Sequence, residues 1–214
     1  DLSPGAVIIG AGISGLSSAY ALAERGRRVI VLDRGQLGRG MTARTTAHLA
    51  SELDDYYCEL IKRRSKDDAR LFAESQRTAI DSVETIVRAE SIDCDFARAD
   101  GYFFAHTEDD QEQLEEEYEG ALEAGMDVAW AERAPILGVN TGRALRFPNQ
   151  ARLHPLKYLA GLARAIESRG GRLCANSPVV EVDEQGGHVD VTLESGIKLR
   201  GADHEFSSIR GVME

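Results

Sequence analysis

The sequence has 214 residues, enough for one complete domain or for one domain and part of another. Its composition, 43% hydrophobic and 29% charged residues, excludes a disordered or collagen-like chain and favours a soluble globular protein. The formal net charge of -11 argues against general affinity for nucleic acid or for an anionic membrane, so neither partner is expected.

The cysteines give no sign of a metal site. Cys58, Cys94 and Cys174 lie far apart, without CxxC spacing or a nearby histidine pair, so we expect no metal and a reducing cytoplasmic environment. The uncharged stretch 2–23 is long enough to span a membrane. It is interrupted by glycine and serine and lacks a basic segment before it, so it favours a soluble strand, turn and helix.

The first elements in chain order form a strand, a helix and a second strand. Residues 6–9 and 29–32 are apolar throughout, which is typical of parallel strands covered on both faces, and 13–25 has helical composition. Further elements are expected down the chain: helices near 51–64 and over 66–89, a strand over 96–105, a helix over 108–124 and a strand over 127–130. Ser65, with Asp68 three positions later, predicts the start of the second of these helices.

The helix over 108–124 is strongly acidic. It has apolar residues at i, i+4 and i+8, namely Leu114, Tyr118 and Leu122, which we expect on its buried side. The acids are expected to form a solvated face, with an acidic docking surface as the alternative interpretation. They are Glu108, Asp109, Asp110, Glu112, Glu115, Glu116, Glu117 and Glu119.

The last part of the chain predicts a helix and a small antiparallel sheet. The helix covers 155–168, with Pro155 in its first turn and Gly170 just after its end. Strands are expected over 179–183, 189–193 and 197–200, joined by turns at 185–187 and 194–196.

A glycine-rich turn after the first strand carries the functional signal. Gly10, Gly12 and Gly15 form a GxGxxG pattern between a predicted strand and a predicted helix, and Ile13 and Ser14 lie inside it. The first glycine permits a tight turn, the second lets a pyrophosphate approach the backbone, and the third lets the helix pack closely. The helix N-terminus would attract the phosphates.

Asp33 completes this pattern. It ends the second strand 23 residues after Gly10, where it is expected to accept hydrogen bonds from ribose hydroxyls and to disfavour a 2′-phosphate. The sequence therefore predicts a Rossmann-like α/β dinucleotide-binding domain, although this pattern does not distinguish FAD from NAD.

The segment after Asp33 resembles a known family. Gly38-Arg39-Gly40-Met41-Thr42-Ala43-Arg44 and Thr45-Thr46-Ala47-His48 are similar to the flavin-lining segment of the FAD-dependent D-amino-acid oxidase (DAO) superfamily. Within it, the second run looks most like the branch that carries a C-terminal Rieske iron–sulfur domain. A second block, Leu153-His154-Pro155, a helix, Gly170-Gly171 and Val179-Val180-Glu181-Val182, is similar to a later part of that family.

The resemblance implies FAD as cofactor and an amine or amino acid as small-molecule substrate. It implies hydride transfer from the carbon bearing the nitrogen to flavin N5. Arg44 and His48 are then the candidate catalytic residues, as a positive charge and a titratable donor near the flavin. The expected cofactor contacts are Gly10, Gly12, Ile13, Ser14, Gly15, Asp33, Arg34, Gly40, Met41, Thr42, Ala43 and Val180.

The resemblance also implies a division of the chain. We expect a discontinuous FAD-binding domain over 1–95 and 150–204, part of a substrate domain over 96–149 and an atypical tail over 205–214. The family continues with further strands that this sequence does not show, so the chain resembles a C-terminally truncated member. A non-catalytic FAD-binding or structural fragment, self-associating as a homo-oligomer, is the alternative to an enzyme.

Overall fold

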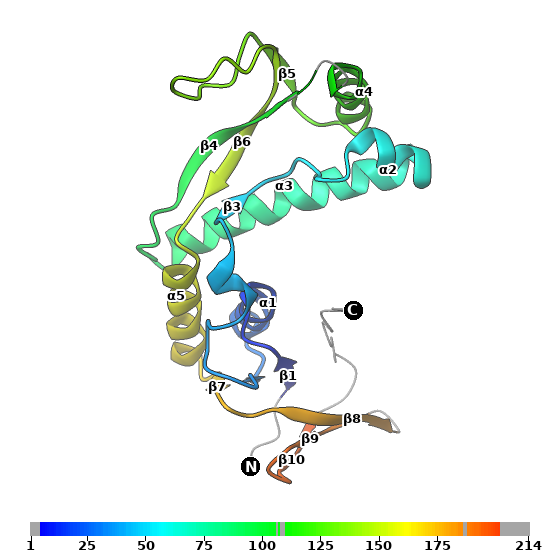
Figure 1. The fold of residues 1–214 in the computed structure, drawn as a ribbon. Helices are drawn as coiled ribbons and strands as arrows, with labels where there is room; N and C mark the ends of the chain where they lie inside the picture. The colour runs from blue at the N-terminus through cyan, green and yellow to red at the C-terminus, as the bar shows by residue number, and fades with distance from the viewer. Residues whose placement is uncertain (1–4, 106, 108–109, 186–187, 202–214) are drawn as a thin grey trace. The chain divides into compact units, whose positions relative to one another are not determined.

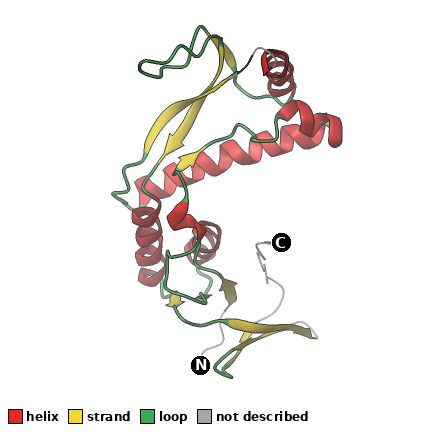
Figure 2. Cartoon of the chain, in the orientation of Figure 1, coloured by secondary structure: helices red, strands yellow, loops and turns green. Residues whose placement is uncertain are grey.

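The computed structural model describes residues 5–105, 107, 110–185 and 188–201. They form two compact units, each built from separate stretches of the chain (Figures 1 and 2). Among the described residues, unit 1 contains those within 5–46, 92–94 and 154–201, and unit 2 contains those within 47–91 and 95–153. The predicted tail at 205–214 and part of the predicted turn at 185–187 lie outside the described residues.

The division into units differs from the predicted domain boundaries. Residues 47–91 were expected in the first domain, but they belong to unit 2 because Tyr57, Ala69 and Ala73 lie in its hydrophobic core. Residues 150–153 also belong to unit 2, as the end of one of its strands. The assignment of one unit to FAD and the other to substrate stays a prediction.

Unit 1 is built on a three-stranded parallel sheet. The order is β1 (Ala6–Ile9), β2 (Val29–Leu32) and β7 (Arg172–Cys174), with α1 (Ile13–Glu24) joining the first two strands. All four residues of β2 are buried, as expected for the middle strand of a covered sheet. The predicted strand, helix and strand are confirmed, whereas the short strand β7 was not predicted.

Two layers cover this sheet. On one face, α1 and α5 (Pro155–Ser168) pack against each other and against the strands. On the other face, Val7, Ile30 and Leu32 share a core with Val191 and Leu193. The last two belong to an antiparallel sheet of β8 (Val179–Gln185), β9 (His188–Leu193) and β10 (Lys198–Gly201), close to the predicted ranges.

The helix α5 begins and ends as its sequence predicts. Pro155 occupies the first turn, and Gly170 follows the last turn with a φ of 82°, a left-handed conformation that glycine adopts without strain. His154 accepts the backbone N–H of Lys157 through Nδ1 at 3.4 Å, and its own N–H donates to the carbonyl oxygen of Cys94 at 2.6 Å. His154 is therefore a helix cap.

Unit 2 contains a four-stranded antiparallel sheet. Its central strand is β6 (Ala144–Arg152), which pairs with β4 (Ala97–Phe104) on one edge and with β3 (His48–Leu49) and β5 (Ala129–Ala131) on the other. β6 was not predicted, because Pro148 and Asn149 interrupt its alternation. Asn149 has a φ of 61°, and the register between β4 and β6 shifts between Ala99 and Gly101.

Three helices share a hydrophobic core with this sheet. They are α2 (Tyr57–Arg63), α3 (Lys66–Ala89) and α4 (Asp110–Glu123), and the core includes Tyr57, Leu114, Leu145 and Phe147. The Ser65 hydroxyl accepts the N–H of Asp68 at 3.0 Å, which confirms the predicted start of α3. None of the helices among the described residues is long and apolar enough to cross a membrane.

The start of α2 was predicted six residues too early. Residues 51–56 form a loop, and Tyr56 has a φ of 63°, which is incompatible with helical continuation. The loop is held by the side chain of Gln150, which accepts hydrogen bonds from the N–H and the hydroxyl of Ser51. A partner 99 residues away in the sequence therefore decides where this helix begins.

Candidate functional site

The glycine turn between β1 and α1 has the geometry that its pattern predicts. Gly10 has a φ of 102°, and its N–H donates to the carbonyl oxygen of Leu32 at 2.7 Å. A Cβ atom at Gly15 would lie 1.9 Å from the carbonyl oxygen of Gly10 and 3.3 Å from Cγ2 of Ile8. The helix thus crosses the strand end so closely that only glycine fits at position 15.

Asp33 joins the glycine turn to the end of β2. Its Oδ2 accepts the N–H of Ala11 at 2.7 Å and its Oδ1 accepts the N–H of Gly35 at 2.8 Å. The side chain is only partly buried, and each carboxylate oxygen has a second lone pair for a further donor. The carboxylate is therefore oriented by the chain itself, and its predicted contact with ribose stays a prediction.

The N-terminus of α1 meets the segment that was predicted to line the flavin. This segment forms a short 3-10 helix, η1 (Met41–Arg44), and the hydroxyl of Thr42 accepts the N–H of Ile13 at 3.2 Å. Gly12 is the N-cap residue of α1 and offers no side-chain cap, and the first turn of the helix contains no acidic residue. The positive end of the helix dipole and the open backbone at Gly12 thus suit a ligand that carries phosphate.

Most of the remaining predicted cofactor residues lie at the surface of unit 1. Ser14, Arg34 and Ala43 are exposed, Gly40 precedes η1 as its N-cap, and Met41 is 63% exposed. Their predicted contacts with FAD stay predictions.

Val180 lies in β8, a separate part of unit 1. Its side chain is 62% exposed, and the pairing of β8 with β9 shifts register between Val179 and Glu181, which skips Val180. A backbone released from the ladder in this way is compatible with the predicted cofactor contact of Val180, which stays a prediction.

The two predicted catalytic residues lie on different elements. Arg44 is the last residue of η1 in unit 1 and is exposed. His48 lies in β3 of unit 2, where it pairs with Arg152 of β6, and its side chain is also exposed. The polar atoms of both side chains therefore lie at the surface and not in the interior.

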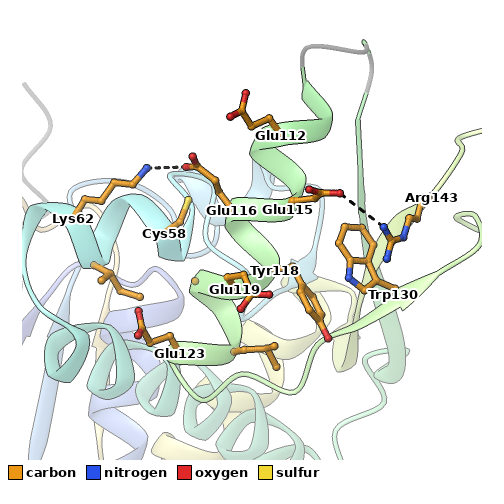
Figure 3. A pocket seen from close by; sticks show the side chains of 13 residues that line it. Cys58, Lys62, Glu112, Glu115, Glu116, Tyr118, Glu119, Glu123, Trp130 and Arg143 are labelled. Atoms are coloured by element: carbon orange, nitrogen blue, oxygen red, sulfur yellow. Dashed lines mark hydrogen bonds and ion pairs between the residues drawn. The ribbon is translucent and has the colours of Figure 1, made fainter.

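Unit 2 has a surface pocket that the sequence did not indicate (Figure 3). It lies over α2, α4 and β5, and Trp130 stands at one side with the guanidinium of Arg143 over its ring at 3.7 Å. The ring of Tyr118 lies 5.1 Å from that of Trp130. The carboxylates of Glu59 and Glu116 both bind Lys62, at 2.9 and 2.8 Å.

One acid of α4 is buried, although all the acids of this helix were predicted to lie on a solvated face. Glu117 is only 2% exposed, and its Oε2 accepts the N–H of Cys58 at 3.0 Å, at the start of α2. Leu122, which was expected inside, is 43% exposed. The prediction was wrong for Glu117 because a carboxylate that serves a helix N-terminus takes the buried position that an apolar residue usually fills.

Burial determines the protonation behaviour of this junction. It raises the pKa of Glu117, while the hydrogen bonds from the N–H groups of Cys58 and Tyr57 act in the opposite direction. Burial and the nearby Glu117 raise the pKa of the Cys58 thiol to about 11. Cys58, Glu59 and Glu116 are close enough together to bind a cation, but Lys62 already satisfies both carboxylates and the thiol stays protonated.

The comparisons with known proteins identify the family of the chain. Residues 6–206 match the model of the FAD dependent oxidoreductase family, DAO. The chain is 33% identical over 188 residues to YhfW of Bacillus subtilis, which is named as a Rieske 2Fe-2S iron–sulfur protein, covering 88% of this chain and 36% of that protein. It is 29% identical over 180 residues to the gamma-glutamylputrescine oxidoreductase of Escherichia coli, covering 82% and 42%.

Solved structures show the same fold. The L-proline dehydrogenase of P. horikoshii gives a TM-score of 0.74 at 16% identity, covering 94% of this chain and 51% of that one. The glycine oxidase of Geobacillus kaustophilus gives 0.70 at 18% identity, covering 96% and 55%. The chain thus spans about a third to a half of the length of the proteins it matches. It belongs to the DAO family of FAD-dependent oxidoreductases, as its glycine turn and the segment after Asp33 predicted.

Proposed function

We propose that this chain binds FAD and takes part in the oxidation of a small amine or amino acid at the carbon bearing the nitrogen. The observation that carries the proposal is the glycine turn, in which Gly15 permits the close helix crossing and Asp33 holds the turn against β2. FAD, when bound, supplies the hydride acceptor at its N5 atom. The residues of the chain bind this cofactor and position the donor carbon.

The described contacts support a distribution of binding roles. The N-terminus of α1, between Gly12 and Gly15, would receive the pyrophosphate, and Asp33 would receive the ribose hydroxyls. The Thr42 hydroxyl already contacts the start of this helix, because it accepts the N–H of Ile13. A phosphate oxygen would compete for the same N–H, so we propose that the Thr42 hydroxyl then turns to donate to the phosphate.

Arg44 and His48 are the residues that we propose near the reacting centre. A positive charge beside the flavin ring stabilises the negative charge that the ring gains on reduction, and an imidazole can hold or move a proton at Nδ1 or Nε2. Both side chains are exposed in the described chain and are free to meet a ligand.

The relatives support an amine or amino acid as the substrate class. The matched proteins include a gamma-glutamylputrescine oxidoreductase and, at 27% identity over 202 residues, a glycine oxidase of Bacillus licheniformis. An oxidised carbon next to nitrogen is common to the reactions that these names describe. We propose this substrate class for the present chain and leave the electron acceptor unassigned.

The visible spectrum of the purified chain tests the proposal. FAD is added in excess and removed by gel filtration, and retained absorbance of bound flavin is the expected result. Gly12→Val should abolish retention, because its side chain would fill the space that a pyrophosphate needs beside Thr42. Ala21→Val, at a partly exposed position of α1 away from the glycine turn, is the matched control and should retain the flavin.

The outcomes separate the proposal from its alternative. A folded wild-type chain that retains no flavin contradicts the proposal. Retained flavin that glycine, proline and putrescine all fail to bleach under anaerobic conditions supports instead a FAD-binding chain without amine oxidation.

A further inference from the structure

Two turns at one end of the parallel sheet of unit 1 have the same construction. Helix α1 ends with Arg25 as its C-cap and α5 ends with Arg169, and each cap is followed by a glycine with positive φ, Gly26 or Gly170. Each arginine donates through Nη1 to the carbonyl oxygen four residues before it, at 3.0 and 2.9 Å. The two turns lead into β2 and β7, which pair with each other, so the turns lie side by side.

These turns bring together exposed arginines from distant parts of the chain. Arg27 and Arg28 directly precede β2, and Arg172 is the first residue of β7. The guanidinium carbon of Arg169 lies 5.1 Å from the ring centre of Tyr20 in α1, so the end of α5 lies close to the neighbouring helix. We call the exposed residues of the two turns the arginine cluster: Arg25, Arg27, Arg28, Arg169 and Arg172.

Helix capping accounts for only part of this cluster. The two C-cap arginines offset the negative ends of their helices. Arg27, Arg28 and Arg172 lie outside the helices, at the starts of strands. The last turns of the two helices contribute the acids Glu24 and Glu167, which are fewer than the arginines. Such a concentration of positive charge, in a chain with a net charge of -11, indicates a surface that binds an acidic partner.

The chain itself carries a matching acidic surface in unit 2. Its stretches 47–91 and 95–153 contain 12 basic and 23 acidic residues, which accounts for the whole formal net charge of -11. Helix α4 contains seven acids and no basic residue. Glu112 and Glu119 on this helix are exposed, and neither forms an ion pair with another described residue (Figure 3). Glu115 and Glu116 are also exposed, although each lies near a cation of its own unit.

The two surfaces have similar spacings. Side chains one turn apart on a helix lie about 5–6 Å apart, so the exposed acids of α4 are spaced at about this distance. Neighbouring strands of a sheet lie about 4.8 Å apart, which sets a similar spacing between the arginines that precede β2 and the arginine that begins β7. Several ion pairs could therefore form at once between one arginine cluster and one acidic helix.

We propose that the arginine cluster of one copy of this chain binds the exposed acidic face of α4 in a second copy. The contact joins two different surfaces, so the copies associate head to tail. Exposed ion pairs are individually weak and are screened by salt, so the association is reversible and depends on several pairs together. This inference goes beyond the proposed function and does not depend on flavin.

Sedimentation velocity of the full 214-residue chain, without added FAD, tests the contact. At about 0.01 M salt, where charges interact over about 30 Å, we expect association that increases with protein concentration. At about 1 M salt, where the range falls to about 3 Å, we expect the monomer. A chain that stays monomeric at low salt, or an association that high salt does not weaken, would overturn the proposal.

Charge reversal on each surface identifies the contact. An acidic variant combines Arg27→Glu, Arg28→Glu and Arg172→Glu, and a basic variant combines Glu112→Lys and Glu119→Lys. Each variant alone should raise the dissociation constant about tenfold or more, because like charges then face each other. An equal mixture of the two should associate again, because the new glutamates meet the new lysines. Both variants keep a negative net charge, so overall attraction does not explain this rescue.

A matched control reverses three arginines elsewhere. Arg63→Glu, Arg64→Glu and Arg133→Glu change exposed residues of unit 2 and should leave the association as it is in wild type. Equal weakening by this control, or a mixture of the acidic and basic variants that stays monomeric, would refute the specific contact. If the acidic variant fails to fold, glutamine at the same three positions replaces it and should still weaken the association.

Discussion

Two carboxylates in the two units perform the same local task in different surroundings. Asp33 in unit 1 accepts the N–H of Ala11 beside the start of α1, and Glu117 in unit 2 accepts the N–H of Cys58 at the start of α2. Asp33 is partly exposed, whereas Glu117 is buried. The same hydrogen bond therefore leaves a surface that a ligand can reach in one unit and closes a hydrophobic core in the other.

The glycines beside these carboxylates show the same contrast. Gly15 lets α1 approach the backbone of Gly10, and Gly120 lets α4 approach the backbone of Cys58. In unit 1 this close approach brings the start of a helix next to an open turn. In unit 2 it brings a helix start onto a buried acid. The following substitutions test how far the parallel extends.

Gly15→Ala should have the largest effect. Its Cβ would lie 1.9 Å from the carbonyl oxygen of Gly10, and backbone cannot yield as the end of a flexible side chain can. We expect a loss of about 3 kcal/mol or more in the free energy of unfolding, measured by urea denaturation. Gly40→Ala is the control, because nothing lies within 4 Å of the added atom. Equal stability of the two variants would contradict the close crossing.

Gly120→Ala should have a smaller effect of the same kind. The added Cβ would lie 2.5 Å from the backbone nitrogen of Cys58, and separating α2 from α4 relieves that contact. We expect a loss of about 2 kcal/mol in the free energy of unfolding. Urea denaturation measures it through the fluorescence of Trp130, the single tryptophan of the chain. Glu119→Ala on the exposed side of α4 should leave the transition in place. If Gly120→Ala does not lower the urea midpoint, α2 does not pack against α4 as closely as the structure shows.

Glu117→Gln should change how stability depends on pH. Because the folded pKa is raised above the ordinary 4.5, the folded chain keeps a proton that the unfolded chain releases, so stability falls as pH rises from 4.5 through the folded pKa. Between pH 4 and pH 8 the variant should therefore gain stability relative to wild type, with the gain appearing above pH 4.5. The measurement is urea denaturation across this range, with Glu116→Gln as the exposed control. If the free energies of unfolding of wild type and Glu117→Gln depend on pH in the same way, the pKa of Glu117 is not raised by burial.

Thr42→Val should have the smallest effect on stability. It removes the hydroxyl that accepts the N–H of Ile13, and water can replace it at this partly exposed position. We expect a loss of about 0.5–1 kcal/mol in urea denaturation, within the range of helix caps. Thr42→Ser keeps the hydroxyl and should match wild type. A Thr42→Ser variant as unstable as Thr42→Val would assign the effect to packing of the methyl group instead.

The sequence predicts unit 1 well because its signals are local. The turn at Gly10, the close helix at Gly15 and the acid at Asp33 all lie within a short stretch whose spacing follows from backbone geometry. The hydrogen bond from Ile13 to Thr42 was beyond this pattern, since it depends on how η1 folds back. The family resemblance nevertheless selected Thr42 as a residue of the site.

Unit 2 is less predictable because distant residues decide its local structure. The central strand β6 contains Pro148 and Asn149, which hide the alternation that marks a strand. The burial of Glu117 depends on α2, whose N-terminus supplies a donor from elsewhere in the chain. Likewise, the carboxyl group of Glu52 packs against Gly101 of β4, and no sequence pattern connects the two.

The pairing of β2 with β7 has a consequence for synthesis on the ribosome. These neighbours in the sheet of unit 1 are separated by more than a hundred residues, and that interval contains all of unit 2. At translation rates of about 5–20 residues per second, the N-terminal strands wait several seconds for their partner. During this time β2 presents an unpaired apolar edge, so nascent chains should need chaperone protection until β7 emerges.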